Sequence, residues 1–227
     1  MPGTDPLLFL KMLREDGIDH IYLSRGPAAR GGSGPGKGTA VDEAILKLRA
    51  EVQQCTRCAV LAQHRTQTVF GAGDIRAKLV FVGEAPGADE DKQGIPFVGR
   101  AGQLLTKIIV AMGLSREEVF ICNVLKCRPP GNRPPAPDEV TNCRPFLTRQ
   151  LQLIKPKIIC ALGTHASQAL LQTDRPISAL RGTFTEYEGI PLMCTYHPAY
   201  LLRSPGEKGK VWEDMKKILQ RLQEPPE

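Results

Sequence analysis

The feature that most constrains this chain is a series of short, continuously apolar segments separated by helical patterns. Four segments, AKLVFVG, EVFICNVL, PKIICALG and GIPLMCTYHP, occupy residues 77–83, 118–125, 156–163 and 189–198. Amphipathic patterns predict helices over residues 40–55, 102–113, 137–155, 164–172 and 207–223. Strands without polar alternation are typical of a parallel sheet covered on both faces. The sequence therefore predicts an α/β protein: a three-layer αβα fold with a central, mostly parallel sheet.

Composition sets the class of protein and leaves two interpretations of its charge. The chain has 227 residues, of which 41% are hydrophobic and 24% charged, so it can bury a substantial core. It contains no apolar run of about 18 residues and no pattern of a secretory signal, so we expect a cytoplasmic protein without a membrane partner. Lys and Arg exceed Asp and Glu by 30 to 24, a net charge of +6. This charge fits either a polyanionic partner or a merely soluble basic surface.

The chain divides near residue 40. Residues 24–40, SRGPAARGGSGPGKGTA, contain too few large apolar groups to offset the entropy of ordering, so residues 1–40 are predicted to be an N-terminal extension with a flexible linker. Residues 5–23 carry a short helical pattern, and we expect residues 1–25 either to pack on the main body or to bind a protein partner. Residues 41–227 are predicted to form the main domain, and we expect a monomer.

The seven cysteines fall into two groups. Cys122, Cys160 and Cys194 lie in apolar strand-like segments, where we predict core packing. The other four lie in segments rich in Pro, Arg and Asn: Cys55, Cys58, Cys127 and Cys143. In a chain without a signal sequence such cysteines indicate a metal site first, then redox chemistry, then packing.

Polar residues follow the predicted strands and should meet at one edge of the sheet. In parallel sheets the ligand lies beyond the carboxyl ends of the strands. FVGEAPG, Asn123, ALGTHAS and YHPAYLLR all stand at such ends. His197 precedes a proline immediately after a strand, which places a titratable donor at the site edge, whereas we predict that His165 is an exposed residue at a helix start. The four acids of residues 84–91 raise the question of what a carboxylate-rich loop does in a basic chain.

Several motifs together resemble a known family. GEAPGADED, PFVGRAG, NVLKCRPPGNRPP and YHPAYLLR, with the four loop cysteines in order, are similar to the family-4 uracil-DNA glycosylases, the iron-sulfur type. The resemblance covers about residues 44–220 and leaves the first 40 outside it. It implies a uracil-DNA glycosylase-like fold and a DNA-repair enzyme. Such an enzyme flips uracil out of DNA and hydrolyses its N-glycosidic bond, leaving free uracil and an abasic site.

The resemblance also implies a cofactor and a base pocket. Cys55, Cys58, Cys127 and Cys143 match the ligands of a 4Fe-4S cluster, with a zinc site as the alternative. Phe97 matches the aromatic residue that stacks on the base, and Asn123 matches the residue whose amide reads the uracil edge. Gly83 and Ala85 belong to the same substrate site; Ala85 stands where classical uracil-DNA glycosylases carry a water-activating Asp.

Further roles are implied by position in the motifs. His197 would donate to uracil O2, and Glu84 would place the substrate and support the cationic sugar. Glu90 and Asn132 remain alternatives for ordering the water. A solvated acidic loop describes Asp89 and Asp91 better than it describes Glu84 and Glu90.

The DNA surface is predicted from the residues that follow His197. Leu201 and Leu202, flanked by Arg203, match a loop that enters the minor groove and fills the space of the flipped base. Candidate phosphate contacts are Arg100, Arg128, Arg133 and Lys210. A covalently trapped relative is disfavoured because residues 126–139 contain no histidine. The alternatives that stay open are a glycosylase for other deaminated bases and a non-catalytic DNA-binding iron-sulfur scaffold.

Overall fold

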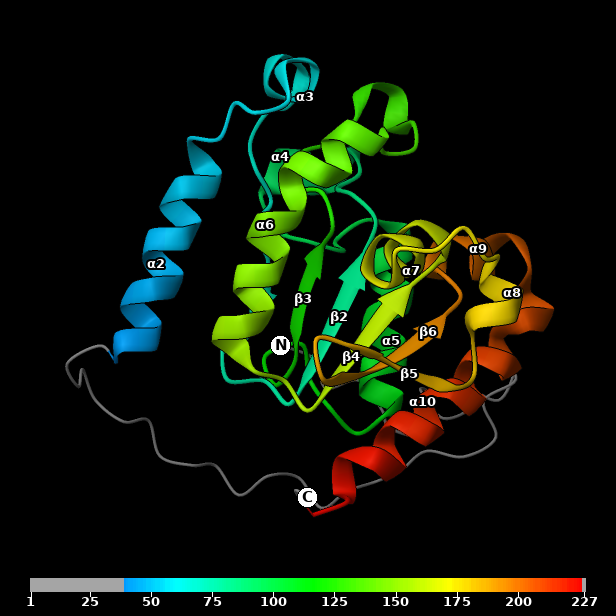
Figure 1. The fold of residues 1–227 in the computed structure, drawn as a ribbon. Coiled ribbons are helices and arrows are strands. Elements are labelled where there is room, and N and C mark those ends of the chain that lie inside the picture. Colours follow the sequence, from blue (N-terminus) through cyan, green and yellow to red (C-terminus); the bar gives the residue numbers. More distant parts are fainter. Residues whose placement is uncertain (1–38, 226–227) are drawn as a thin grey trace, which may run out of the picture.

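The computed structural model describes residues 39–225, which form one six-stranded sheet with helices on both faces (Figure 1). The strand order is β1-β3-β2-β4-β6-β5. The strands are β1 (Ala72–Gly73), β2 (Leu79–Gly83), β3 (Phe120–Asn123), β4 (Ile158–Leu162), β5 (Phe184–Tyr187) and β6 (Ile190–Thr195). The helices and 3-10 turns are α2 (Ala40–Gln53), α3 (Ala59–His64), α4 (Ala88–Gln93), α5 (Arg100–Ala111), η1 (Pro130–Asn132), α6 (Pro137–Ile154), α7 (Thr164–Leu171), α8 (Ile177–Leu180), α9 (Pro198–Arg203), η2 (Pro205–Glu207) and α10 (Lys208–Gln223).

The four predicted strands form the parallel centre of the sheet. β3, β2, β4 and β6 pair in parallel, and each corresponds to one of the apolar segments of the sequence. All five residues of β2 are buried, as are all five of β4. The absence of polar alternation in these segments is explained, because both faces of each strand are covered. The α/β prediction is confirmed.

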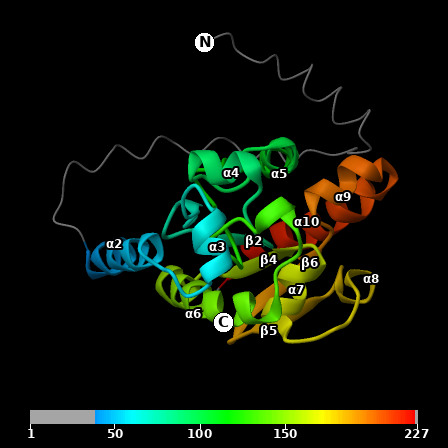
Figure 2. The same cartoon turned by 90° about the horizontal axis from the view of Figure 1, so that it is seen from above.

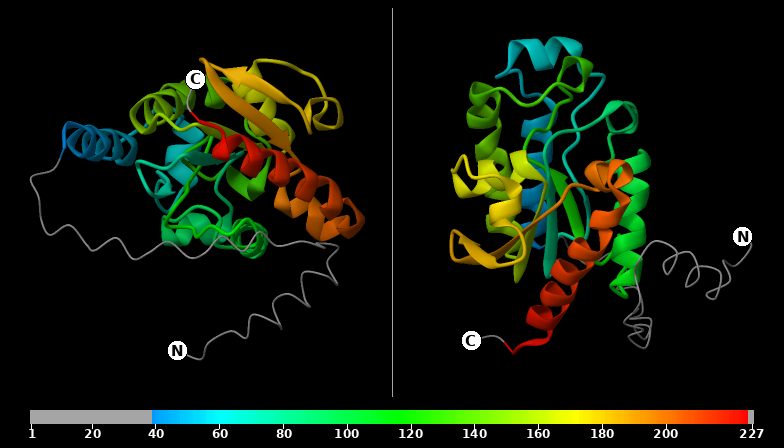
Figure 3. Two further views of the ribbon diagram at one scale, coloured as in Figure 1. Left: turned by 90° about the horizontal axis from the view of Figure 1, so that it is seen from below. Right: turned by 90° about the vertical axis from the view of Figure 1, so that its right-hand side faces the viewer.

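Alternate residues of β2 contribute to two separate cores. Val80 and Val82 pack in a cluster with apolar residues of α2, α6 and α7. Leu79 and Phe81 pack in a second cluster with α5 and α10. Figure 3 shows the sheet lying between these two helical layers. The three-layer arrangement therefore follows from the period-two geometry of a strand that is apolar on both sides.

Both edges of the sheet are antiparallel, which the sequence pattern did not predict. β5 joins β6 through Glu188 and Gly189, whose φ angles of 48° and 79° suit a two-residue hairpin turn. β1 pairs antiparallel with β3 over only two residues. The exposed β5 and the two-residue β1 are too polar or too short to give a strand signal.

The predicted acidic loop is largely a helix. Residues 88–93 form α4, and its first turn carries Asp89, Glu90 and Asp91. Asp89 is exposed, as expected for a solvated acid, but Asp91 is 2% exposed. The prediction for Asp91 is wrong because its two carboxylate oxygens accept from the backbone N of Thr66, at 2.9 and 3.0 Å, and so join α4 to the segment after α3.

The carboxyl ends of the parallel strands point toward one rim of the molecule. Figure 2 looks down on this rim, with α3, α4, α7 and α9 around it. Among residues 39–225 no helix has both the length and the apolar character needed to cross a membrane. The predicted extension and partner-binding helix lie outside the described residues, so the division at residue 40 stays a prediction.

Candidate active site

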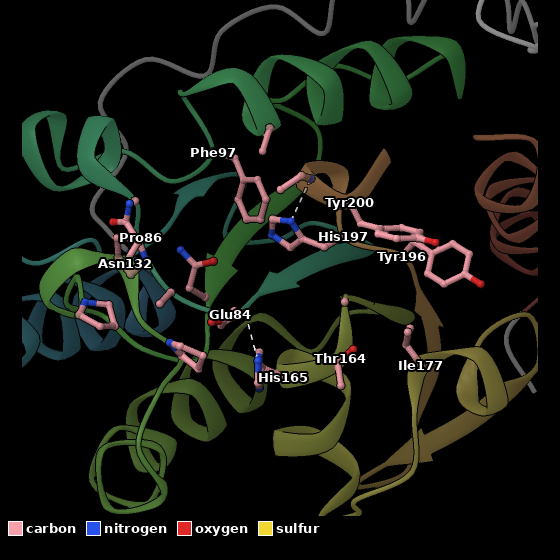
Figure 4. A pocket seen from close by; sticks show the side chains of 18 of the residues that line it. Glu84, Pro86, Phe97, Asn132, Thr164, His165, Ile177, Tyr196, His197 and Tyr200 are labelled. Carbon is pink, nitrogen blue, oxygen red and sulfur yellow. Dashed lines mark hydrogen bonds and ion pairs between the residues drawn. The ribbon is translucent and has the colours of Figure 1, made fainter. Parts of the chain in front are cut away.

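A cavity of about 890 Å³ opens at this rim, where four segments of the chain meet (Figure 4). It is lined by residues at or just beyond the ends of β2, β3, β4 and β6, including Glu84, Asn123, Gly163 and His197. In the sheet β2 lies between β3 and β4. The strand that follows β2 in the chain, β3, pairs on one side of it, and the next strand, β4, pairs on its other side. A crevice at such a reversal is the expected ligand site of an open parallel sheet.

Phe97 forms one wall of this cavity. Its ring lies 5.6 Å from that of His197, centroid to centroid, and the side chain is 6% exposed. Its φ of 53° is unusual for a residue with a side chain. Arg116 holds the turn by donating to the Pro96 and Phe97 carbonyls at 2.7 and 3.0 Å. The aromatic face is thus fixed before any ligand binds.

Two glycines make room for this wall. A Cβ on Gly83 would lie 2.4 Å from Asn123 Oδ1 and 2.5 Å from the Phe97 ring. A Cβ on Gly102 would lie 2.0 Å from the Phe97 carbonyl group. Gly83 is therefore needed for the close approach of the two side chains, rather than for a contact of its own.

Asn123 is the most informative residue of the cavity. It is 1% exposed, yet neither Oδ1 nor Nδ2 has a hydrogen-bond partner among the described residues. Leaving a buried donor and acceptor unpaired is costly, and such groups in a native site require an explanation. A planar ligand with one acceptor and one donor on neighbouring atoms would satisfy both.

His197 lines the same cavity as a neutral ring. Its Nδ1 accepts from the backbone N of Ala199 at 3.0 Å, at the start of α9. This bond leaves Nε2 to carry the hydrogen. Burial, assisted by the positive charge of Arg203, lowers the pKa of His197 from 6.5 to about 4. Near neutral pH the side chain is an uncharged donor.

Glu84 brings a carboxylate to the cavity directly after β2. Burial raises the pKa of Glu84 above its usual value, and the electrostatic interaction with His165 opposes that shift. His165 Nε2 lies 4.0 Å from Glu84 Oε2. Figure 4 marks this ion pair with a dashed line. The imidazole is 44% exposed, as predicted, but it also lines the cavity and faces Glu84.

Glu90 serves the backbone. Its Oε2 accepts from the N of Gly87 at 3.1 Å, and its Oε1 accepts from the N of Val98 and of Gly99 at 2.9 Å each. These bonds join the start of α4 to the turn that carries Phe97. Both carboxylate oxygens of Glu90 therefore accept from backbone N–H groups, and its catalytic role stays a prediction.

Asn132 and Ala85 also line the cavity. Asn132 Oδ1 accepts from Arg128 Nε at 2.7 Å, which orients the amide. Ala85 supplies no functional group, so the side of the cavity next to Glu84 lacks a second carboxylate at this position. Among the predicted water-ordering groups, Glu84 has the carboxylate that no backbone N–H occupies.

The predicted DNA wedge needs a correction. Leu201 is 1% exposed and packs in the core with α5 and α10, so it is not available for insertion. Leu202 is 39% exposed and Tyr200 is 36% exposed on the same helix, α9. Arg203 is exposed and lines the cavity. The helical period of α9 turns Leu201 inward and presents its neighbours to solvent.

Three of the predicted phosphate contacts already have protein partners. Arg133 binds Glu139 through two bonds of 2.6 and 2.9 Å, Lys210 pairs with Glu207 at 2.9 Å, and Arg128 donates to Asn132. Arg100 is exposed at the first residue of α5. Arg203 therefore lines the cavity as an exposed cation, and Arg100 is exposed next to Ala101, which lines it.

The four predicted ligand cysteines lie together. Cys55, Cys58, Cys127 and Cys143 line one small cavity beside the ends of α2 and α6. Three sulfurs accept N–H groups: Cys127 Sγ from Arg65 Nη1 at 3.1 Å, Cys143 Sγ from the N of Lys126 at 3.3 Å, and Cys58 Sγ from Asn142 Nδ2 at 3.7 Å. Donors directed at sulfur are what thiolates require.

This sulfur site fits a group that carries positive charge. Burial raises the pKa of Cys58 and Cys127 above the usual value, and that of Cys143 to about 12. Bound metal cations are what would hold such thiols as thiolates. A single zinc ion would gather its ligands at about 2.3 Å from one centre. Within residues 39–225 no three His, Cys, Asp or Glu groups are gathered closely enough for one ion.

The remaining cysteines behave as predicted. Cys122, Cys160 and Cys194 are at most 1% exposed and lie within the two cores. The sequence did not single out Arg116, Lys126, Tyr196 or Tyr200, although each touches the site or its supports. An isolated Tyr or Arg in a sequence carries no sign of what it will contact.

Comparison with known protein families shows the family of this chain. Residues 70–222 match the model of the uracil DNA glycosylase superfamily. The chain belongs to this superfamily, in its type-4 branch. The branch follows from relatives named type-4 uracil-DNA glycosylase. That of Sulfurisphaera tokodaii is 45% identical over 186 residues, covering 78% of this chain and 84% of its own length. That of Archaeoglobus fulgidus is 42% identical over 186 residues, covering 78% and 92%.

A neighbouring branch is more distant. A type-5 uracil-DNA glycosylase of Pyrobaculum aerophilum is 31% identical over 179 residues, covering 65% of this chain and 79% of its own length. The resemblance seen in the motifs is thereby confirmed, and it extends beyond them to most of the residues that the structure describes.

Proposed function

We propose that this protein is a uracil-DNA glycosylase that flips uracil out of DNA and hydrolyses its N-glycosidic bond. The products are free uracil and an abasic site. The observation that carries this conclusion is Asn123, a buried amide whose donor and acceptor have no partner among residues 39–225 and which lines the cavity at the carboxyl ends of the strands. Membership of the type-4 branch supports the same reaction.

Recognition of uracil follows from the chemistry of that amide. Uracil presents an acceptor at O4 and a donor at N3–H, which match Nδ2–H and Oδ1 of Asn123. Cytosine presents a donor at its amino group and an acceptor at N3. If Asn123 is held in one orientation, cytosine leaves both of its groups unpaired, which is the stronger form of discrimination. The ring of Phe97 provides the face on which the flipped base stacks.

Departure of the base requires charge stabilisation at two places. As the C1′–N1 bond breaks, its electron pair passes to uracil, which leaves as an anion. The Nε2–H of His197 is assigned to uracil O2, where negative charge develops. A neutral imidazole suits this task, because it donates without having to lose a proton. Its tautomer is fixed by the backbone N of Ala199.

The sugar becomes cationic while the base leaves. Glu84 is the carboxylate assigned to stabilise this cation and to receive a proton from the attacking water. The water oxygen then forms the new bond to C1′. Asn132, oriented by Arg128, is assigned to the water or the sugar edge, and Ala85 leaves space where a second carboxylate would otherwise stand.

The sulfur site is proposed to hold a 4Fe-4S cluster. Cys55, Cys58, Cys127 and Cys143 would supply four thiolates, and Arg65, Asn142 and the N of Lys126 would donate to them. When bound, the cluster ties together the segments of α3, α6 and the strand end after β3, and the hydrolysis needs no redox step. Further proposals are a monomer, a cytoplasmic location in contact with the nucleoid, uracil-containing DNA as partner, and a protein partner for residues 1–25.

The enzyme is tested with an end-labelled oligonucleotide that holds one uracil. Anaerobic incubation followed by alkaline cleavage should give a break at the uracil together with free base. Asn123→Ala should lower the rate about tenfold or more through lost hydrogen bonds. His197→Ala should lower it about a hundredfold, as expected for loss of a donor to a developing anion. His64→Ala, exposed and outside the cavity, is the matched control.

Two results would favour the alternatives. Release of hypoxanthine or xanthine at rates similar to uracil would indicate a glycosylase for deaminated bases in general. A shift of the oligonucleotide in a gel without release of base would indicate a binding scaffold and contradict the enzyme.

A further inference from the structure

The structure contains a buried lysine that the reaction does not use directly. Lys126 is 1% exposed and is among the largest fully buried side chains of the molecule. It stands three residues after Asn123 and immediately before Cys127. Placing an ammonium group in the interior is expensive unless it is well paired, so an apolar residue would be cheaper if packing were its only role.

The ammonium group of Lys126 is held by two acceptors. Nζ donates to the backbone carbonyl of Asn123 at 2.7 Å and to Oε1 of Gln150 at 2.5 Å. Gln150 on α6 is 0% exposed and donates in turn to the Phe70 carbonyl at 2.8 Å. Lys126 therefore joins the backbone carbonyl of Asn123 to Gln150 on helix α6, whose side chain is itself held by the Phe70 carbonyl.

The backbone of Lys126 is fixed as well. Its N donates to Cys143 Sγ, and its carbonyl accepts from the N of Val69 at 2.7 Å. Both acceptors of Nζ are neutral, while Cys143 and Cys122 lie close enough to feel its positive charge. A thiolate-bound metal group at the cysteine site would carry the negative charge that balances the ammonium. The two acceptors of Nζ and this negative charge together explain why a buried lysine is tolerated here.

We propose that Lys126 is a positioning residue that fixes the Asn123 amide and joins it to the cysteine site. The side chain of Asn123 has no hydrogen bond of its own within the described residues, so its orientation depends on its backbone and on the packing of Gly83 and Phe97. Lys126 supplies the backbone restraint. Base selectivity of the pocket thus depends on a residue that never touches the base.

The test measures binding rather than turnover. Oligonucleotides with one 2′-fluoro-deoxyuridine or one 2′-fluoro-deoxycytidine resist cleavage and report selectivity for the flipped base. Lys126→Met should reduce the uridine-over-cytidine affinity ratio about tenfold or more, with affinity for the cytidine oligonucleotide unchanged, because a hydrogen bond from a charged donor is lost. The control variant is Lys78→Met, which removes the same charge at an exposed position just before β2, at the end of the strand away from the cavity. It should leave the affinity ratio unchanged.

Iron content and the melting midpoint separate positioning from folding. An unchanged ratio in a folded Lys126→Met protein with full iron would overturn the inference. If that variant does not fold, Gln150→Met decides, because it keeps the charge and removes one anchor. It should lower the ratio about threefold to tenfold; an unchanged ratio would reject the proposal.

The inference rests on the proposed function, and the same assay keeps the two apart. A wild-type protein without selectivity for uridine would contradict the role of Asn123 itself. Selectivity in the wild type that persists in the variants would contradict only the role of Lys126.

Discussion

At the scale of single residues, the proposed chemistry assigns a neutral ring to His197. Its pKa of about 4 keeps the ring uncharged through the neutral range, so that Nδ1 is free to accept from the N of Ala199 and Nε2 carries the hydrogen. We expect single-turnover excision to stay level from pH 8 to about pH 6 and to fall as the pH approaches the pKa of His197. Glu84 contributes to the same acid limb, since burial raises the pKa of that carboxyl.

His197→Gln separates the two groups. The amide keeps a neutral donor but cannot titrate, so any acid limb that remains belongs to Glu84. An excision rate that rises between pH 7 and pH 5 in the wild type would mean that the imidazolium is the active form, contrary to this assignment.

The same ring links pH to stability. The pKa of His197 is lower in the folded protein than its ordinary value of 6.5, so the unfolded chain binds more protons between pH 6.5 and about 4. Stability is therefore lost as the pH falls through this range and then levels off. Urea unfolding of the wild type should show this dependence, and His197→Gln should reduce it. A wild-type protein that gains stability across the same interval would contradict the sign.

Gly83 offers a second test at this scale. Gly83→Ala places a methyl group 2.4 Å from Asn123 Oδ1 and 2.5 Å from the Phe97 ring, so both must shift. Overpacking of this kind costs about 1–3 kcal/mol of stability. The displaced Asn123 amide should lose about one hydrogen bond to the base, which should lower the excision rate about tenfold or more. The control is Gly206→Ala, where a Cβ would meet nothing within 4 Å. Equal activity of both variants in the oligonucleotide assay would show that the pocket tolerates the displacement.

At the scale of elements, α9 has a buried side chain, Leu201, between two exposed ones, Tyr200 and Leu202, which are proposed to contact DNA. Leu201→Ala should destabilise the protein by about 2–5 kcal/mol, as for other fully buried leucines. Tyr200→Ala and Leu202→Ala should leave the melting midpoint within about 2 °C, since exposed substitutions change stability little, and should weaken binding to uracil-containing duplex. Calorimetry and gel shifts measure the two effects. Loss of DNA binding in a folded Leu201→Ala protein, with none in the other two, would restore Leu201 as the wedge.

How much the sequence predicted depends on the length of each element. The parallel strands are long enough to show as continuous apolar runs, and the helices α2, α5, α6, α7 and α10 are long enough for a helical period to be visible. The six-residue α3, α4 and α9 and the two-residue β1 do not, and their conformations depend on tertiary bonds such as those of Glu90 and Asp91. The motifs predicted which side chains share the site. They did not indicate that Leu201 turns inward or that Glu90 is committed to backbone N–H groups, because both facts are set by packing.

At the scale of the whole molecule, the cavity lies at the carboxyl end of β2, between the two helical layers that cover the sheet. Gly83 ends that strand, Glu84 opens the cavity, and the chain then builds β3 on one side and β4 on the other. The cysteine site lies beside the layer of α2 and α6, at the far end of the segment that carries Asn123 and Lys126. Asn123, the proposed base-reading residue, is therefore joined to the cysteine site by four residues of chain, 123–126, and by the buried ammonium group of Lys126.

This arrangement predicts the effect of removing the sulfur site. Cys143→Ser should abolish bound iron and its visible absorbance, lower the melting midpoint, and reduce excision, since the backbone N of Lys126 loses its sulfur acceptor and the loop after Asn123 loosens. Cys160→Ala is the matched control, because it removes a sulfur at 0% exposure from the core while leaving the four ligands in place. It should lose stability without losing iron or base selectivity. A Cys143→Ser protein that keeps full iron would contradict the ligand assignment, and one that loses iron yet retains uridine selectivity would show that the sulfur site supports the fold without supporting the pocket.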